Sequence, residues 1–451
     1  MRIHFIAIGG SAMHNLAIAL KKNGETVSGS DDEIFEPSAS RLKKYGLLPE
    51  KNGWFPENIS NNIDFIILGM HARADNPELL KAKELKIKIY SYPEFLFEKT
   101  KNKKRIVIGG SHGKTTVTSM IMHVLKTSGI NFDYMVGANI EGFDTMVNLE
   151  EKNPVAVFEG DEYLSSPIDK RPKFHWYKPD IAVLTGIAWD HVNVFPTFEN
   201  YLEQFDIFIK TINPEGKLFY YGNDDYLTNL VSKNPRINAE KYYEIIHKTD
   251  KNGLAVINHN NKEYKLNIFG KHNLENLNAS LMICRELGIT EDKFLSSIMS
   301  FKGASKRLQL LAKNKTGEIY LDFAHAPSKV KATISALKQK NTSVKLTACL
   351  ELHTFSSLKK EFLPQYFNTM KDADEAIVYF NPQVIKHKQL ENLDINYVKN
   401  CFGSDINVFT DTEELQNYLI KKNWSDTNLI FMSSGNFNGI NFQEFANKLI
   451  K

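Results

Sequence analysis

The 451-residue sequence has only three cysteines, Cys284, Cys349 and Cys401, which lie far apart and each in or beside an apolar segment. An odd number of scattered cysteines supports neither a disulfide framework nor a zinc cluster, and it favours a reducing compartment. The sequence also lacks an apolar run near the roughly 20 residues that a membrane-spanning helix needs. We therefore expect a cytoplasmic protein with no membrane partner.

An excess of charge of one sign is also missing. Lysine and arginine number 56 and aspartate and glutamate 53, which gives a formal net charge of +3. Nucleic-acid-binding domains normally carry a strong basic excess, so we expect no nucleic-acid partner. The length exceeds what one hydrophobic core usually supports, and we predict three domains. No feature of the sequence indicates an oligomeric state.

A glycine loop is the most informative feature that is present. An apolar strand pattern at 105–108 runs into glycines, a lysine and two threonines at the start of a helical pattern. Glycines let backbone N–H groups converge on phosphate oxygens, the lysine reaches the β- and γ-phosphates, and the threonine after it can ligate Mg²⁺. The spacing is a short G-x-x-G-K-T, and on its own it leaves a generic P-loop NTPase open. The predicted ATP-binding residues of this loop are Gly110, Ser111, His112, Gly113, Lys114, Thr115 and Thr116.

A carboxylate follows the next apolar strand pattern. Glu159 ends the segment 155–158 and begins the sequence E-G-D-E-Y. Mg²⁺ prefers oxygen ligands and usually takes few from the protein, which suits Thr115 together with one carboxylate from a neighbouring strand. We predict that Thr115 and Glu159 are Mg²⁺ ligands.

A second glycine turn follows the first strand pattern, at Gly9, Gly10 and Ser11. A diphosphate there would rest on a helix N-terminus. The turn lacks the G-x-G-x-x-G spacing of dinucleotide-dependent dehydrogenases, so hydride transfer is disfavoured.

Alternating strand and helix patterns over residues 1–98 predict a parallel sheet with crossover helices. The charged stretch 98–104 has no apolar period and is interpreted as a linker. The predicted fold class is α/β in three domains: a Rossmann-like domain over 1–98 that contains the second glycine turn, a central P-loop ATP-binding domain over 103–302, and an α/β domain over 303–451.

The loop G-S-H-G-K-T-T resembles the Mur ligase family, the ATP-dependent amide-forming enzymes of peptidoglycan metabolism, in its branch that acts on UDP-N-acetylmuramate. Other segments resemble motifs of the same family along the whole chain. They are I-G-G-S-A-M at 8–13, G-S-D at 29–31, E-G-D-E at 159–162, D-H at 190–191, G-K-H-N-L-E-N at 270–276, F-K-G-A-S-K-R at 301–307 and D-F-A-H-A-P at 322–327.

The resemblance implies roles for individual residues. It places UDP-sugar binding at Gly9, Gly10, Ser11, Ser30, Asp31 and His71. It adds Asn273, Asn276, Arg307 and Asp322 to the ATP site, with Asp322 on the ribose and Arg307 on the γ-phosphate. It makes His191 a ligand of a second metal ion, and it makes Lys114, His191, Arg307 and His325 the catalytic residues. The chain departs from the family where Gly186 replaces an asparagine and Ala326 replaces a histidine.

Two segments indicate the acceptor. D-E-Y at 161–163 with D-K-R-P-K-F at 169–174, and M-S-S-G-N-F-N-G-I at 432–440, resemble the tripeptide-adding branch of the family. That branch joins L-alanyl-γ-D-glutamyl-meso-diaminopimelate, the murein tripeptide, to UDP-N-acetylmuramate through an acyl phosphate, using ATP and Mg²⁺, in peptidoglycan recycling. Lys170, Arg171 and Lys173 are the predicted acceptor contacts, although a solvated basic turn is an alternative. An alanine-adding ligase and a UDP-sugar sensor without turnover are the alternative functions.

Overall fold

The computed structural model describes residues 1–192, 194–403 and 405–450. The chain folds into two compact units. Unit 1 comprises Met1–Ile187, Thr197–Tyr243 and Ala279–Ser297, and unit 2 comprises Ala188–Pro196, Glu244–Asn278 and Ile298–Lys451. Among the described residues, no helix is both long and apolar enough to cross a membrane.

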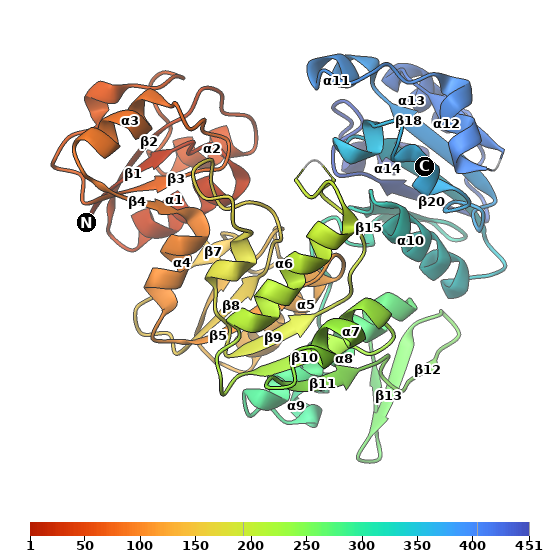
Figure 1. Cartoon of the computed structure of the whole chain (residues 1–451). Coiled ribbons are helices and arrows are strands. Elements are labelled where there is room, and N and C mark those ends of the chain that lie inside the picture. The colour runs from red at the N-terminus through yellow and green to blue at the C-terminus, as the bar shows by residue number, and fades with distance from the viewer. Residues whose placement is uncertain (193, 404, 451) are drawn as a thin grey trace. The chain divides into compact units, whose positions relative to one another are not determined.

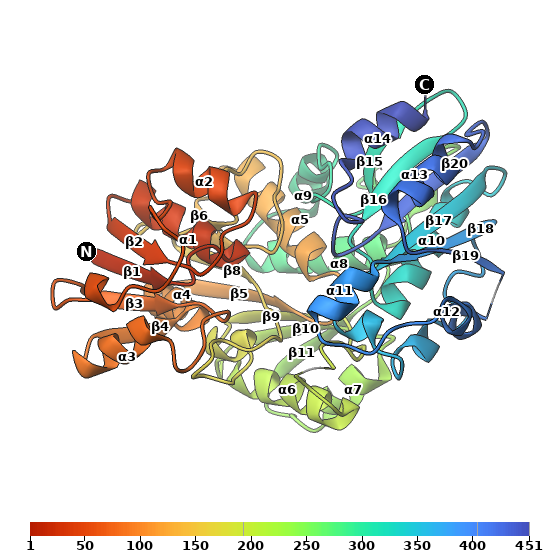
Figure 2. The ribbon, with the colours of Figure 1, turned by 90° about the horizontal axis from the view of Figure 1, so that it is seen from above.

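The first sheet of unit 1 is fully parallel and has the order β2-β1-β3-β4 (Figure 2). Its strands are β1 (Arg2–Ile6), β2 (Thr26–Ser30), β3 (Phe65–Leu68) and β4 (Lys88–Ser91), and its helices are α1 (Ser11–Lys22), α2 (Ser38–Lys44), α3 (Pro77–Glu84) and α4 (Tyr92–Thr100), with the 3₁₀ turn η1 (Pro56–Asn58). From β1 the chain crosses to β2 on one side, and it then returns to β3 on the other side. The carboxyl ends of β1 and β3 therefore form a topological switch point, where open α/β sheets bind ligands.

The second sheet of unit 1 has the order β11-β10-β9-β5-β8-β6-β7, with only the short β7 antiparallel (Figure 1). Its strands are β5 (Lys104–Gly109), β6 (Phe132–Met135), β7 (Val147–Asn148), β8 (Val155–Glu159), β9 (Ile181–Leu184), β10 (Lys217–Tyr221) and β11 (Asn238–Tyr242). Helix α5 (Lys114–Thr127) lies on one face, and α6 (Phe198–Thr211) and α7 (Asp225–Ser232) lie on the other (Figure 2). The unit also contains η2 (Lys173–Trp176), α9 (Glu291–Ile298) and the C-terminal part of α8 (Lys271–Glu286).

Unit 2 contains a small antiparallel sheet and a six-stranded sheet of order β15-β16-β20-β17-β18-β19, in which only β15 is antiparallel. The small sheet consists of β12 (Lys248–Thr249), β13 (Ala255–His259) and β14 (Lys262–Lys265). The larger sheet consists of β15 (Gln309–Lys313), β16 (Glu318–Asp322), β17 (Lys345–Leu352), β18 (Glu375–Phe380), β19 (Ile406–Phe409) and β20 (Thr427–Met432). Its helices are α10 (Pro327–Lys340), α11 (Pro382–His387), α12 (Ile395–Phe402), α13 (Thr412–Ile420) and α14 (Phe442–Leu449), with the 3₁₀ turns η3 (Ser356–Leu358) and η4 (Leu363–Tyr366).

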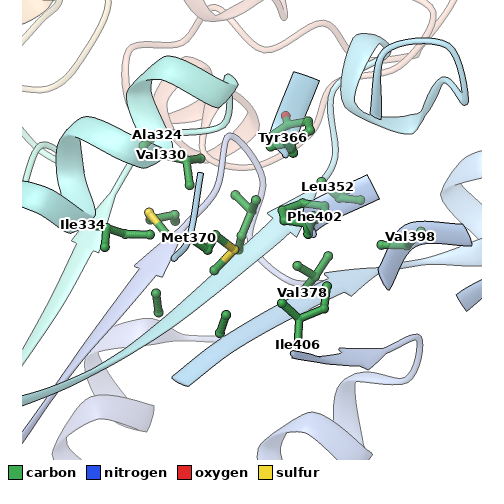
Figure 3. Packing of buried hydrophobic residues seen from close by; sticks show 14 of the residues in the cluster. Ala324, Val330, Ile334, Leu352, Tyr366, Met370, Val378, Val398, Phe402 and Ile406 are labelled. Carbon is green, nitrogen blue, oxygen red and sulfur yellow. The ribbon is translucent and has the colours of Figure 1, made fainter. Parts of the chain in front are cut away.

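Both faces of the larger sheet of unit 2 are buried. On one face, Val330 and Ile334 of α10 and Phe402 of α12 pack with Val378 and Ile406 (Figure 3). The other face packs against α13 and α14. Apolar residues of β16, β17, β18 and β20 alternate between the two clusters, as the two-residue period of a strand requires when both faces are buried.

The predicted α/β class is confirmed, because strands alternate with helices and the three larger sheets are parallel apart from β7 and β15. The predicted linker at 98–104 is wrong in part, because α4 continues to Thr100 and β5 begins at Lys104. The helix α4 is stabilised by its buried residues Phe95 and Leu96 and by a capping box at Ser91, so its last turn can carry charged residues at the surface. The domain boundaries 1–98, 103–302 and 303–451 stay predictions.

Candidate active site

The glycine loop connects β5 to α5 at the centre of the second sheet of unit 1. Gly110 has a φ of 122° and Gly113 a φ of 75°, a region that side chains other than glycine rarely adopt. A Cβ on Gly110 would lie 2.8 Å from the backbone nitrogen of Thr185 and closer still to its hydroxyl. Ser111 N donates to Gly186 O at 2.9 Å, which joins the loop to the end of β9. The loop geometry fits the predicted phosphate cradle.

Lys114 begins α5 and lies among carboxylates. Its Nζ donates to Glu162 Oε2 and to Gly110 O, each at 2.6 Å. Burial opposes the charge, but the carboxylates of Glu162 and Asp161 outweigh it and raise the pKa of Lys114. Lys114 is therefore a cation at neutral pH, as phosphate binding requires.

The predicted Mg²⁺ ligands Thr115 and Glu159 lie together in unit 1. The hydroxyl of Thr115 donates to Glu159 Oε1 at 3.0 Å, and the backbone nitrogen of Gly137 donates to Glu159 Oε2 at 2.7 Å. The parallel register pairs Glu159 with Ile108, so β8 delivers the carboxylate to the edge where β5 delivers the loop. A hydroxyl and a carboxylate are hard oxygen donors, and the pair fits Mg²⁺.

The third predicted metal ligand, His191, belongs to unit 2, so its role beside Glu159 stays a prediction. Its backbone φ is 53°, and its N–H bonds the side chain of Asp190 at 2.8 Å. Lys329 Nζ lies 3.4 Å from the other oxygen of Asp190. Despite burial, Lys329 and His191 hold the pKa of Asp190 far below its ordinary value, so the carboxylate is charged.

The predicted UDP-sugar residues gather at the switch point of the first sheet. Gly9 N donates to Asp31 Oδ2 at 2.7 Å, and a Cβ on Gly9 would lie 2.9 Å from that oxygen. Burial raises the pKa of Asp31 to about 6. Gly10 and Ser11 start α1, and the buried hydroxyl of Ser30 has no hydrogen-bond partner among the described residues. His71 is exposed after β3. The ligand roles of these residues stay predictions.

Contacts between α1 and the second sheet were not predicted. Asn15 Oδ1 accepts from the backbone nitrogen of Met146 at 3.0 Å and from the Arg41 guanidinium at 3.0 Å. Arg41 also donates to Asp144 O at 2.9 Å. Asn15 and Met146 are 131 residues apart, and no local pattern in the sequence signals such a pair.

The remaining predicted ATP residues lie in unit 2. The carboxylate of Asp322 accepts from Leu308 N at 2.6 Å and from Ala324 N at 2.7 Å, so it holds the start of β15 against the end of β16. The Arg307 guanidinium lies over the ring of Phe323, 4.6 Å from its centroid. Asn273 Nδ2 donates to Phe269 O at 3.0 Å, and Asn276 is buried. Asp322 thus has a structural role besides the predicted ribose contact, which stays a prediction.

His325 is neutral at physiological pH. Burial, with the nearby cation of Lys329, lowers its pKa to about 4. The Nδ1–H group donates to Phe323 O at 2.8 Å, which leaves the lone pair on Nε2. His325 therefore offers a hydrogen-bond acceptor and no positive charge.

Because the pKa of His325 is lowered, the free energy of unfolding should decrease as the pH falls. An unfolded chain binds a proton on His325 below its ordinary pKa of 6.5, whereas the folded chain does so only below about 4, so stability present above pH 6.5 is lost as the pH falls toward 4. The wild type should lose about 2 kcal/mol more unfolding free energy than His325→Gln between pH 7 and pH 5. Denaturant titrations at both pH values measure it. His387→Gln, at an exposed position of α11, is the control and should behave as the wild type; the same loss in His325→Gln as in the wild type would contradict the prediction.

The predicted acceptor cations are largely paired within unit 1. Lys173 Nζ lies 2.6 Å from Asp161 Oδ2, and Arg171 pairs with Asp169 at 2.9 Å while stacking over Trp176. Lys170 is exposed. The segment is a folded turn, closed by a bridge between Leu164 and Pro172. Contact of these three cations with an acceptor stays a prediction.

A cluster of polar side chains at the carboxyl ends of two strands of unit 2 was not predicted. The chain leaves β17 toward β18 and leaves β20 toward α14, so the carboxyl ends of these neighbouring strands form a switch point. Glu351 is 3% exposed there and accepts from Phe437 N at 2.9 Å and from the Ser433 hydroxyl. His353 Nδ1 lies 3.5 Å from Glu351, and Lys306 Nζ donates to Gly435 O at 3.4 Å. The charged residues directly after the apolar strand pattern were the available signal.

Comparisons with known proteins identify relatives along most of the chain. The family model described as "Mur ligase family, catalytic domain" matches residues 2–104, and "Mur ligase middle domain" matches residues 108–284. The UDP-N-acetylmuramate–L-alanine ligase of Clostridium kluyveri is 33% identical over 394 residues, 84% of this chain and 82% of that protein.

Two solved structures are also similar. One is the UDP-N-acetylmuramate:L-alanyl-γ-D-glutamyl-meso-diaminopimelate ligase from Neisseria meningitides, with a TM-score of 0.61 and 26% identity, covering 67% of this chain and 98% of that one. The other is the UDP-N-acetylmuramate-alanine ligase from Thermotoga maritima, with a TM-score of 0.72 and 20% identity, covering 100% of this chain and 98% of that one. The second likeness concerns the fold alone.

Proposed function

This chain belongs to the Mur ligase family, whose members are ATP-dependent ligases that form amide bonds, and from that premise we propose which bond it forms. The proposed reaction joins L-alanyl-γ-D-glutamyl-meso-diaminopimelate to UDP-N-acetylmuramate, in peptidoglycan recycling in the cytoplasm. The observation that carries this choice is the folded turn at 161–177, which begins two residues after Glu159 and whose sequence resembles the tripeptide-adding branch.

The residues of unit 1 support the ATP half of the reaction. The muramate carboxylate attacks the γ-phosphorus of ATP, ADP leaves, and an acyl phosphate forms. The loop from Gly110 to Thr116 binds the phosphates, and Lys114 compensates the charge that develops as ADP leaves. Thr115 and Glu159 would hold Mg²⁺, which supplies further positive charge to the phosphate oxygens.

The second half is attack by the amine of the acceptor on the acyl carbon, which forms the amide and releases phosphate. Arg307 is proposed to stabilise the phosphate charge. His325 is proposed to orient the reacting groups through the lone pair on Nε2, because its low pKa excludes a positive charge there. A tripeptide carries several carboxylates, and Lys170, Arg171 and Lys173 are the proposed cationic contacts.

The acceptor is tested by direct competition of substrates. The purified protein is given UDP-N-acetylmuramate, ATP and Mg²⁺ with the tripeptide or with L-alanine, and products are resolved by mass. We expect kcat/KM to be at least about a hundredfold higher with the tripeptide, because remote carboxylates add binding energy that positions the amine. Higher efficiency with L-alanine would replace this proposal with the alanine-adding ligase.

The alanine-adding alternative has a specific observation in its favour, since the Clostridium kluyveri relative carries that name. A UDP-sugar sensor is the alternative from another class. It would bind UDP-N-acetylmuramate and show no ATP-dependent product with either acceptor, an outcome that would overturn both ligase assignments.

A further inference from the structure

The ammonium group of Lys114 is oriented by a buried carboxylate of unit 1. Glu162 is 1% exposed, and its Oε2 accepts from Lys114 Nζ at 2.6 Å, while Gly110 O accepts from the same nitrogen at 2.6 Å. An ammonium has three N–H donors, so these two contacts leave one for a phosphate oxygen. The direction of that third donor therefore depends on where Glu162 is held.

Glu162 is held in turn by a tyrosine from helix α6. The hydroxyl of Tyr201 donates to Glu162 Oε1 at 2.9 Å, across 39 residues of sequence. The hydroxyl of Ser111, in the glycine loop, lies 2.8 Å from the same tyrosine oxygen. Tyr201 is fully buried, and its ring packs against Phe205 with the centroids 5.2 Å apart. Ser111, Tyr201, Glu162 and Lys114 thus form one hydrogen-bonded chain that begins and ends in the glycine loop.

We propose that Tyr201 is a positioning residue for ATP turnover: its hydroxyl fixes the carboxylate of Glu162, and Glu162 aims the ammonium of Lys114 at the phosphates. This inference rests on the proposed function only in that Lys114 acts on ATP. Without the hydroxyl, Oε1 of Glu162 loses the hydrogen bond from Tyr201, and the carboxylate is held less firmly in its present orientation. The ammonium then loses its fixed direction while keeping its charge.

We expect loss of the Tyr201 hydroxyl to lower kcat and to leave the KM for ATP nearly unchanged. Affinity for ATP comes from many loop contacts, so a reoriented ammonium changes it little. Turnover requires the ammonium to stabilise the negative charge that develops on the phosphates in the transition state. A misdirected ammonium therefore lowers mainly kcat. A merely structural role for Tyr201 would instead lower thermal stability and the active fraction of the protein.

Unit 1 offers a matched control for removing a buried tyrosine hydroxyl. Tyr177 is also fully buried, and its hydroxyl has no hydrogen-bond partner among the described residues. Tyr201→Phe and Tyr177→Phe remove the same atom from two buried rings. They differ in whether that atom holds Glu162.

The experiment compares both variants with the full-length wild type. Steady-state kinetics give kcat and the KM for ATP with whichever acceptor supports turnover, and calorimetry gives the affinity for ADP with Mg²⁺. We expect Tyr201→Phe to lower kcat about tenfold, with ADP affinity and KM within about twofold, and Tyr177→Phe to match the wild type. Unchanged kcat in Tyr201→Phe, or an equal loss in Tyr177→Phe, would overturn the proposal.

A double-mutant cycle with Glu162→Gln tests the path from Tyr201 to Lys114. If Tyr201 acts through Glu162, the double variant loses no more kcat than Glu162→Gln alone, whereas additive losses would contradict the path. Glu162→Gln also carries the test if Tyr201→Phe does not fold, since its kcat should fall while ADP still binds. The kcat ratios can be measured with L-alanine as well as with the tripeptide, so an error in the acceptor assignment would not be mistaken for a failure of this inference.

Discussion

Replacing Lys114 with alanine is expected to lower kcat about a thousandfold, which corresponds to about 4 kcal/mol of transition-state stabilisation. The reason is that, in the proposed mechanism, Lys114 supplies the side-chain cation that meets the phosphates, and the glycines of the loop carry no charge that could replace it. Affinity for UDP-N-acetylmuramate should stay near the wild-type value, because its predicted site lies at Gly9 and Asp31 on the first sheet of unit 1. Phosphate release and calorimetry measure the two quantities.

The Lys114→Ala variant also leaves Glu162 without its cationic partner, and a buried unpaired carboxylate destabilises the fold. The double variant Lys114→Ala/Glu162→Gln separates the two effects, since it should recover thermal stability and no activity. Lys126→Ala is the control, because it removes an exposed lysine from the other end of α5 and should leave kcat unchanged. Near wild-type turnover in Lys114→Ala would remove this lysine from the mechanism.

Exchanging Glu159 for glutamine is expected to raise the Mg²⁺ concentration needed for half-maximal activity by about a hundredfold, since an amide has one acceptor oxygen and no charge for a divalent ion. The side chain stays the same size. One of the two contacts that Glu159 now accepts, from Thr115 or from Gly137 N, is lost, so the orientation of the threonine hydroxyl suffers as well. Activity titrated with Mg²⁺ at saturating substrates measures the shift.

Glu150→Gln is a suitable control for Glu159→Gln, because Glu150 follows β7 in the same unit and its exposed carboxylate accepts a hydrogen bond from Asn148 Nδ2 at 3.2 Å. Its metal requirement should equal that of the wild type. If Glu159→Gln shows the same titration curve as the wild type, Glu159 is no metal ligand, and the carboxylate serves only to hold Thr115 and Gly137.

The glycine loop between β5 and α5 was predictable because its signal is local. Gly110 and Gly113 adopt positive φ values that other residues avoid, and the apolar strands before the loop and before Glu159 are visible as short runs. In a parallel sheet, the carboxyl ends of neighbouring strands share an edge, so Thr115 and Glu159 could be expected to meet. The same locality explains the error at 98–104, where charge alone suggested a linker although Phe95 and Leu96 continue the buried face of α4.

The sequence by itself determined the α/β class, the two glycine turns and the residues at the ends of β5 and β8, because periodicity and glycine backbone preferences are written into adjacent residues. Only the tertiary structure decided which distant side chains contact the residues of these turns and strand ends. Tyr201 reaches Glu162, and Asn15 reaches Met146, through the order of strands and the packing of helices on the sheets. Such contacts join segments that are distant along the chain, and their formation depends on the cooperative packing of whole elements, which no local pattern records.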